Sequence, residues 1–323
     1  MLKLLEKARC AACLCVFAAS LSACAGNQPQ TIPSGPAQQA AAHRAAGRGG
    51  ALLYAGGQRE GTIYSYPDGS FIGNFSTPAT IHGMCSDAKG NVFVVAAKHG
   101  AKPSAAGYIY EFAHGGTSPV ATLDLPTSEI PVSCSSDPGS GDLAVTSYDR
   151  RNYAPMIEVY AGASGTPSTF TSRAIGANPQ PAYDADGNLF VTSGGNQGVE
   201  LLKGSSQLEK ITFDQTLGGV DHAQWDGAHF ALQSFQNSQH NKERLLEHVY
   251  RLQISGKRAT IVGLSHFKNW LARDPGQSWI DADTMVATPG NYIAFWKYPG
   301  GGQAYLVLHP SHVSKAVTIS SAP

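Results

Sequence analysis

A turn followed by a strand recurs along the chain at nearly constant spacing, and this repeat constrains the fold more than any other feature. Each copy places an Asp and usually a Gly before a short apolar strand. Three clear copies are Asp87–Val94, Asp137–Val145 and Asp184–Val191, and looser ones begin at Ala51, Trp225 and Asp281. The aligned positions 51, 91, 142, 188, 228 and 285 lie 40, 51, 46, 40 and 57 residues apart. Spacings of about 40 to 50 residues between strands predict the blades of a β-propeller.

A second strand with alternating apolar and polar residues follows each of these units. The six segments are 63–66, 109–112, 157–160, 199–202, 249–252 and 293–296. Alternation of β-branched and aromatic residues with polar ones is typical of strands. Polar or Gly-rich hairpins then lead into further strands, such as those expected over 119–125 and 304–308. We therefore predict an all-β fold, a six-bladed β-propeller with four-stranded antiparallel blades.

The first unit lacks a strand on its N-terminal side, because the residues before Ala51 are rich in Ala and Gly. The C-terminal segment 312–320 has strand composition and follows the sixth unit. We expect it to supply the missing inner strand of the first blade and so to close the ring.

The N-terminus has the composition of a secretory signal peptide. Lys3, Lys7 and Arg9 precede an apolar run of residues 10–21, which is shorter than the roughly 20 residues of a membrane span. The sequence Leu-Ser-Ala-Cys that ends at Cys24 resembles a bacterial lipobox, which implies cleavage before Cys24 and acylation, including palmitate, on it. The alternative is an ordinary signal peptide cut near Ala23 or Ala25.

The resulting organisation is a lipoprotein signal peptide over 1–23, a flexible tether over 24–50 and a propeller over 51–323. The tether has almost no large apolar residue and cannot bury enough surface to offset the entropy of ordering. More than one acyl chain gives firm membrane attachment. We expect an exported protein of the cell envelope, held by lipid on Cys24 at the outer membrane or periplasmic face if the cell has two membranes.

Cysteine use leaves one question open. The three Cys of the signal peptide and Cys24 do not belong to the folded body, so only Cys85 and Cys134 remain there. Both precede equivalent Asp turns. They are able to form one disulfide, or to face opposite ways on neighbouring strands.

Composition excludes one class of partner. The chain has 23 Lys plus Arg against 23 Asp plus Glu, and the basic residues are scattered. Because nucleic-acid binding requires a cationic stripe, we expect no nucleic-acid partner. Only 14% of residues are charged, against roughly 25% in typical soluble domains, which favours turn-rich β structure. We expect a monomer.

The Asp-x-x-Gly-Asn-Leu-Phe-Val turns and the Ile-Tyr-x-Phe strands resemble those of NHL and SMP-30 type (TolB-like) six-bladed propellers, in particular a group of bacterial lipoproteins of unknown function. The resemblance covers about residues 51–320. It implies fold more than activity, because this fold includes metal-dependent lactonases, streptogramin-type lyases and binding modules.

Loops that enter the inner strands of a propeller surround one mouth of its channel. The polar residues expected there are His82, Glu129, Gln180, Asp221, His222 and His312. They do not reproduce the acidic and Asn ligand set that the resemblance to lactonases implies. Asp184 and Asp186 resemble the start of a calcium loop, but position twelve is Gly195 rather than Glu, so we expect a plain turn.

Two insertions interrupt the spacing. Residues 239–248 are polar and lie between two predicted strands, whereas 265–273 predict a short helix capped by Ser265, with Phe267, Trp270 and Leu271 on one face. We expect this helix to cover the fifth and sixth blades.

The sequence favours a ligand- or protein-binding module without a resident cofactor. The alternative is a lactonase-like hydrolase or streptogramin-lyase-like enzyme that uses the channel mouth, and only that alternative requires a divalent metal. The sequence does not identify the ligand.

Overall fold

The computed structural model describes residues 50–98, 107–125, 129–176, 178–236, 245–268, 275–312 and 314–322. They all belong to one compact unit, Ser34–Pro323. The predicted signal peptide, the tether and Cys24 lie outside the described residues. Within the described part, none of the helical structure has the length and apolar character needed to cross a membrane.

The described residues form β-strands almost throughout. Their bounds are β1 (Leu52–Ser65), β2 (Phe71–Ser86), β3 (Val92–Ala97), β4 (Gly107–Phe112), β5 (Ala121–Asp124), β6 (Glu129–Ser136), β7 (Leu143–Asp149), β8 (Pro155–Tyr160), β9 (Ser168–Phe170), β10 (Gln180–Tyr183), β11 (Leu189–Thr192), β12 (Gly194–Leu201), β13 (Leu208–Trp225), β14 (Phe230–Gln236), β15 (Leu245–Ser255), β16 (Arg258–His266), β17 (Pro275–Asp281), β18 (Thr284–Pro289), β19 (Ile293–Lys297), β20 (Gly301–Leu308) and β21 (Ala316–Ser320). One short 3-10 helix, Ala161–Ala163, follows β8.

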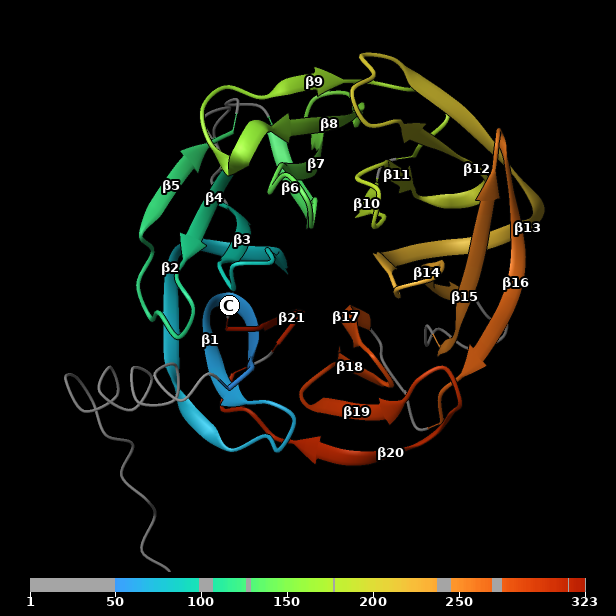
Figure 1. Ribbon diagram of the computed structural model, residues 1–323. Helices are drawn as coiled ribbons and strands as arrows, with labels where there is room; N and C mark the ends of the chain where they lie inside the picture. The colour runs from blue at the N-terminus through green and yellow to red at the C-terminus, as the bar shows by residue number, and fades with distance from the viewer. Residues whose placement is uncertain are drawn as a thin grey trace, which may run out of the picture. The chain divides into compact units, whose positions relative to one another are not determined.

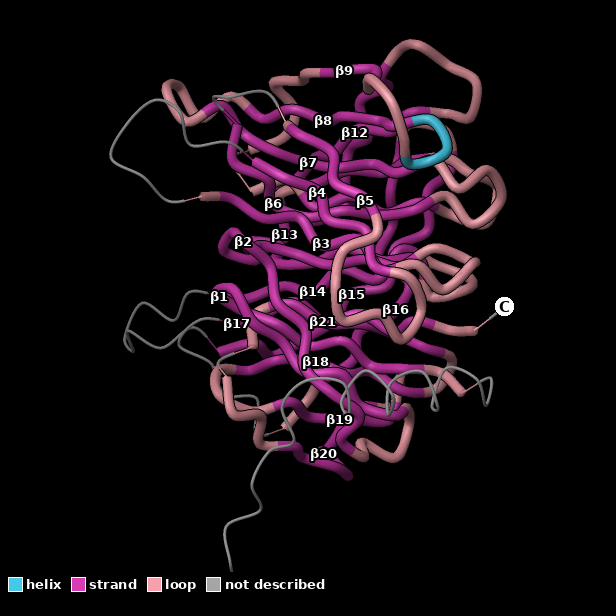
Figure 2. Tube along the Cα trace, turned by 90° about the vertical axis from the view of Figure 1, so that its left-hand side faces the viewer, coloured by secondary structure: helices cyan, strands magenta, loops and turns pink. Residues whose placement is uncertain are grey.

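The strands form curled antiparallel sheets around a common centre (Figure 1). Their orders are β21-β1-β2-β3-β4-β5, β6-β7-β8-β9, β10-β11-β12-β13-β14-β15-β16 and β17-β18-β19-β20. The long strands β1, β2 and β13 bend, so that one end pairs with a different neighbour from the other. Seen from the side, the strands run across the molecule, and loops gather on its two opposite faces (Figure 2).

The C-terminal strand pairs with the first strand, as the sequence suggested. Register runs antiparallel from Leu52 opposite Ser320 to Gly56 opposite Ala316. The paired residues Leu53, Val317 and Ile319 are buried in one apolar cluster with side chains of β18 and β19. The two ends of the described chain thus share one sheet.

One feature differs from a simple ring of separate four-stranded sheets. The 18 residues of β13 pair with β12 at one end and with β14 at the other, and Thr212 and Phe213 also lie parallel to Arg258 and Ala259 of β16. Strands β13 to β16 therefore close into a four-stranded barrel. Its wall is held by an apolar cluster that includes Phe213, Leu217 and Leu252.

Burial follows the position of each strand. All six residues of β3 are buried, because other sheets cover both of its faces. In contrast, β16 and β20 alternate between exposed and covered residues, as expected at an outer edge. The apolar clusters lie between neighbouring sheets rather than at one central point.

The recurring Asp is a turn residue. Oδ1 of Asp87 accepts hydrogen bonds from the backbone N–H of Lys89 and Asn91 at 2.9 and 2.8 Å, and Oδ2 accepts one from the Asn91 amide at 2.9 Å. Asp184 makes the same three contacts with Asp186 and Asn188. The carboxylate oxygens thus hold the turn, in agreement with the plain-turn interpretation of the Asp184 loop.

Two local predictions are settled by the structure. Cys85 and Cys134 form a disulfide. The helix predicted from Ser265 is wrong where it can be checked, because Ser265 and His266 belong to β16 and pair with Val249 and His248. The alternation of exposed and buried side chains continues through Ser265, so the strand simply runs further than the apolar spacing indicated. Residues 269–273 of that prediction, with Trp270 and Leu271, lie outside the described residues, as do 239–244 of the other insertion.

Candidate functional site

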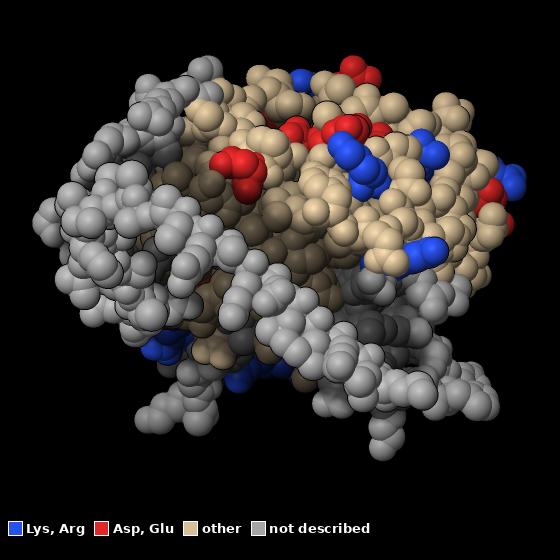
Figure 3. Space-filling model, turned by 90° about the horizontal axis from the view of Figure 1, so that it is seen from below, with Lys and Arg blue, Asp and Glu red and all other residues tan. Residues whose placement is uncertain are grey.

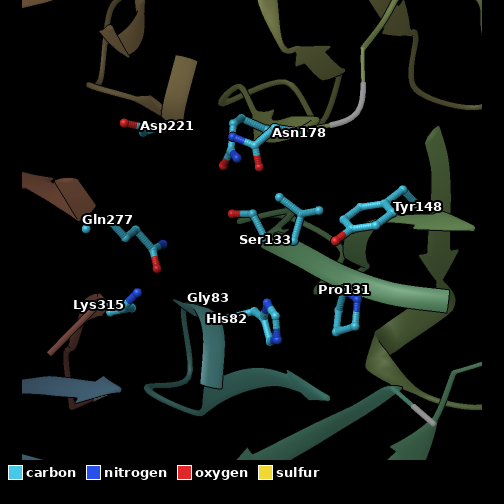
Figure 4. A pocket seen from close by; sticks show the side chains of 12 residues that line it. His82, Gly83, Pro131, Ser133, Tyr148, Asn178, Asp221, Gln277 and Lys315 are labelled. Atoms are coloured by element: carbon cyan, nitrogen blue, oxygen red, sulfur yellow. The ribbon is translucent and has the colours of Figure 1, made fainter. Parts of the chain in front are cut away.

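A cavity of about 230 Å³ opens at the centre of the described strands. Figure 4 shows polar side chains from several sheets directed toward the same open space. The lining comes from β2, β6, β7, β10, β13 and β17 and from residues just before β10 and β21. Its members are His82, Gly83, Pro131, Val132, Ser133, Tyr148, Asn178, Gln180, Asp221, Gly276, Gln277 and Lys315.

Irregular pairing explains why these residues reach the cavity. In β2, Ile81 pairs with Ala96 and Gly83 pairs with Val95, so His82 is the extra residue of a bulge. Equivalent register shifts make Val132 the extra residue on β6 and Asp221 the extra residue on β13. An extra residue in one strand bends that strand and redirects its side chain, and such bulges are frequent beside functional sites.

On β17 the shift lies between Pro275 and Ser278, so Gly276 and Gln277 fall outside the regular ladder. The Gln277 amide then takes over the backbone pairing. Its Oε1 accepts from the Met84 N–H at 2.9 Å, and its Nε2 donates to the Met84 carbonyl at 2.5 Å. This side chain links β17 to β2, and these two bonds use one N–H and one oxygen lone pair of its amide.

Two buried oxygen atoms of the lining remain unsatisfied among the described residues. Ser133 and Gln180 are 2% and 3% exposed, and neither the Ser133 Oγ nor the Gln180 Oε1 has a hydrogen-bond partner. Figure 4 shows the Ser133 hydroxyl directed into the open space. A buried polar group without a partner costs about 1 to 3 kcal/mol, which a hydrogen-bonding ligand would recover.

Charge in the cavity is balanced. Among the described residues of its lining, Asp221 is the only carboxylate and Lys315 the only ammonium. Among the residues that the structure describes, no three His, Cys, Asp or Glu side chains come together as a possible metal site. Figure 3 shows acidic and basic side chains in small groups across one outer face, between wide uncharged areas.

The structure places the sequence-predicted candidates in three different environments. His82, Gln180 and Asp221 line the central cavity. His312 lies instead beside a separate cavity of about 530 Å³, where its Nδ1 is 2.9 Å from the Glu60 carboxylate. Glu129 and His222 line none of the cavities described here, because both are buried between sheets.

Glu129 belongs to a buried pair of carboxyl groups. Glu129 and Glu158 are 2% and 0% exposed, and the Ser147 hydroxyl lies 3.3 Å from an oxygen of Glu129 and 3.0 Å from one of Glu158. Burial, together with the neighbouring Glu129, raises the pKa of Glu158 well above its usual range. Glu158 therefore keeps its proton at neutral pH.

His222 follows the bulged Asp221, so its side chain points away from the cavity. It is 3% exposed and stacks near Trp279, with ring centres 6.5 Å apart. Neither ring nitrogen has a hydrogen-bond partner among the described residues. Burial lowers the pKa of His222 to about 3, so the imidazole is neutral at physiological pH.

Sequence reasoning did not find Ser133, Tyr148, Asn178, Gln277 or Lys315. Four of them, all except Tyr148, lie in or just before β6, β10, β17 and β21, as Gln180 lies in β10. The sequence signal for these residues is their position in the repeat, which marks any polar residue there and not only His and acidic residues.

Comparisons with known proteins place the fold but not the function. A protein of unknown function from Bacteroides caccae has a TM-score of 0.60 at 9% identity, covering 84% of this chain and 99% of the other. A 6-phosphogluconolactonase-like protein from Bacteroides uniformis has a TM-score of 0.52 at 12% identity, covering 81% and 83%. A streptogramin B lyase covers 84% and 74% at 10% identity, but its TM-score of 0.46 is too low to support a conclusion.

No family model and no curated protein matches the sequence. At such low identities the structural likeness concerns the fold alone, which is all-β and propeller-like.

Proposed function

We propose that this chain is a lipid-anchored, six-bladed propeller that binds a small polar molecule in its central cavity. The two unpartnered oxygens of Ser133 and Gln180 carry the proposal. Both residues line a formed cavity, and a ligand that reaches these buried oxygens would satisfy them. The cavity of about 230 Å³ lies below the range of roughly 300 to 1,000 Å³ typical of drug-sized ligands, so the ligand is of monosaccharide or amino-acid size.

Six blades are supported by the lining itself. Six segments, β2, β6, β10, β13, β17 and the approach to β21, each bring residues to the same cavity. If each segment is the inner strand of one blade, the pairing of β21 with β1 joins the last part of the chain to the first blade. The barrel formed by β13 to β16 is then the fifth blade, drawn against the outer strand of the fourth.

Membrane attachment through Cys24 rests on the lipobox-like sequence and on the apolar run before it. It would place the cavity in the cell envelope, within reach of solutes outside the cytoplasm. Metabolic labelling with a palmitate analogue tests this part separately, since Cys24→Ala would abolish the label.

Binding is favoured over catalysis by the state of the serine hydroxyl in the lining. The Ser133 hydroxyl has no hydrogen-bond partner among the described residues, so no neighbouring base activates it. The carboxyl pair of Glu129 and Glu158 lies outside the cavity lining.

Thermal unfolding of the purified chain in the presence of monosaccharides, disaccharides, amino acids or dicarboxylates tests the proposal. One class is expected to raise the Tm, because a ligand that binds only the folded state stabilises it. Val132→Phe, which fills the cavity, and Gln180→Leu, which removes one acceptor, should abolish or weaken that rise. A rise that both variants retain would place the ligand elsewhere.

Ester and lactone substrates belong in the same screen. Turnover that is lost in Ser133→Ala or His82→Ala would replace binding with the hydrolase alternative. An unchanged Tm with every compound class, and no turnover, would remove the cavity as a functional site.

A further inference from the structure

An exposed tyrosine lies beside the central cavity. Tyr153, in the loop between β7 and β8, is 63% exposed and stacks on Tyr148, which lines the cavity. The two ring centres are 5.7 Å apart and the ring planes differ by 21°. Tyr153 therefore extends the aromatic surface of the cavity wall outward to solvent.

The loop that carries Tyr153 is held in one conformation. The Asp149 backbone N–H donates to the Ala154 carbonyl at 2.9 Å, and the Asp149 carbonyl accepts from the Tyr153 N–H at 2.7 Å. The Asp149 carboxylate accepts from the Arg151 N–H at 2.7 Å and pairs with its guanidinium at 3.2 Å. A ligand that stacks on Tyr153 would meet a preorganised ring, which lowers the entropy cost of binding.

The Tyr153 backbone is unusual for a bulky residue. Its φ of +57° lies in the left-handed region, which Gly or Asn adopts far more easily. The loop thus tolerates local strain while presenting a large apolar ring to water. Strain of this kind at a site lip is a feature of ligand-binding positions.

The cavity itself favours a ligand without net charge. Asp221 and Lys315 balance each other, and the unsatisfied Gln180 Oε1 requires a hydrogen-bond donor. The Ser133 hydroxyl is able to donate or accept. A sugar supplies hydroxyls of both kinds together with C–H faces that pack on aromatic rings.

Resting on the proposed function, we infer that the site takes the end of a neutral oligosaccharide. The terminal sugar occupies the cavity, whose volume admits one ring, and the second sugar stacks on Tyr153. Tyr148 lies between the two positions, with its hydroxyl directed toward the cavity in Figure 4. Tyr153 is then a specificity-determining residue that distinguishes disaccharides from monosaccharides.

Saturation-transfer NMR and calorimetric titration of the purified chain test the inference. The probes are glucose, galactose, maltose, cellobiose and lactose, with glycine and succinate as charged comparisons. At least one disaccharide is expected to bind more tightly than either monosaccharide. Tyr153→Ala should weaken that disaccharide between about two-fold and ten-fold, the range of an aromatic contact, and change monosaccharide binding less than two-fold.

Two variants control for loss of an aromatic surface. Tyr153→Phe retains the ring and should bind like the natural chain. Phe71→Ala removes another exposed ring, 50% exposed and outside the cavity lining, and should have no effect. Melting curves of all variants establish that each one folds.

These outcomes distinguish a failure of the saccharide inference from a failure of the proposed ligand binding in the cavity. If a charged probe binds and its binding is lost in Val132→Phe, the proposal of a ligand in the cavity stands, but the inference that this ligand is a saccharide is overturned. Saccharides that bind equally to the natural chain and Tyr153→Ala would overturn the second subsite alone. Saccharide binding that survives in Val132→Phe would overturn the placement of the sugar in the cavity. No binding by any probe would overturn the saccharide inference itself.

Discussion

Cys85 on β2 and Cys134 on β6 are joined by a disulfide that spans 49 residues of sequence and links two neighbouring sheets. Both residues are 1% exposed and belong to the same apolar cluster as Phe93 and Val145. The bond therefore ties together strands that also line the central cavity through His82 and Ser133.

Removing this disulfide is expected to destabilise the fold. For a loop of this length the chain-entropy model gives about 4 kcal/mol, and native disulfides typically contribute about 2 to 4 kcal/mol. The measurement is urea unfolding of the natural chain and of Cys85→Ala/Cys134→Ala. A reducing agent should lower the midpoint of the natural chain only. Equal midpoints under both conditions would show that the bond adds no stability.

His222 should make the fold sensitive to acid. Its pKa is lowered by burial from 6.5 to about 3, so below pH 6.5 the unfolded chain takes up a proton that the folded chain refuses. Stability is complete above pH 6.5 and falls as the pH drops toward 3, by about 1.4 kcal/mol per unit and about 5 kcal/mol in all. Urea unfolding at several pH values measures this slope.

His222→Phe is the matched variant, because it keeps a ring beside Trp279 and removes the titrating nitrogens. It should flatten the acid side of the profile. The exposed His309 offers the matched control, because His309→Phe removes an imidazole that is not buried. An acid slope that persists in His222→Phe would assign it to other groups.

Glu158 should change the pH dependence of stability in the opposite direction to His222. Its pKa is raised in the folded state, above all by burial and also by the neighbouring Glu129. The stability it contributes is complete below its unfolded value of 4.5 and is lost as the pH rises through the folded value. Glu158→Gln, which keeps the shape without the ionisation, should remove that alkaline loss in the same unfolding series. Together with His222, this places maximal stability between about pH 4.5 and 6.5.

The strand β21 is expected to be essential for folding. Deleting residues 316–323 would expose the β1 edge and the buried side chains of Leu53 and Tyr54. We expect loss of the cooperative unfolding transition, or a loss of stability of several kcal/mol. Circular dichroism during heating measures this. Deleting only Ala322 and Pro323 is the control and should have little effect.

The Asp turns offer a test with a control in the same loop. Asp184→Ala removes three hydrogen bonds within the turn and should lower the free energy of unfolding by about 1 to 2 kcal/mol. Asp186→Ala leaves the carboxylate contacts of Asp184 intact and should cost less than about 0.5 kcal/mol. Addition of calcium should not change either value. Equal losses from the two variants would contradict the plain-turn role of Asp184.

Much of the strand pattern could be predicted from the sequence. The segments 109–112 and 157–160 lie in β4 and β8, and the expected strand at 304–308 lies in β20. Such segments are readable because alternation and turn residues are local signals. The partner of the C-terminal segment was also predictable, because the first unit visibly lacked a strand.

The site was less predictable, and bulges are the physical reason. Asp221 and His222 are adjacent, yet one lines the cavity and the other is buried between sheets, because the register shifts between Val220 and His222. A one-residue shift reverses which face each side chain takes, and nothing in simple alternation reveals it. A shift of the same kind on β6 brings three consecutive residues, Pro131, Val132 and Ser133, to the cavity lining.

The pairing of β21 with β1 also has a consequence for biosynthesis. β21 follows every other described strand in the chain, so β1 lacks this partner until β21 has left the ribosome. Products of premature termination would keep this open edge, which makes them natural targets for proteolytic quality control.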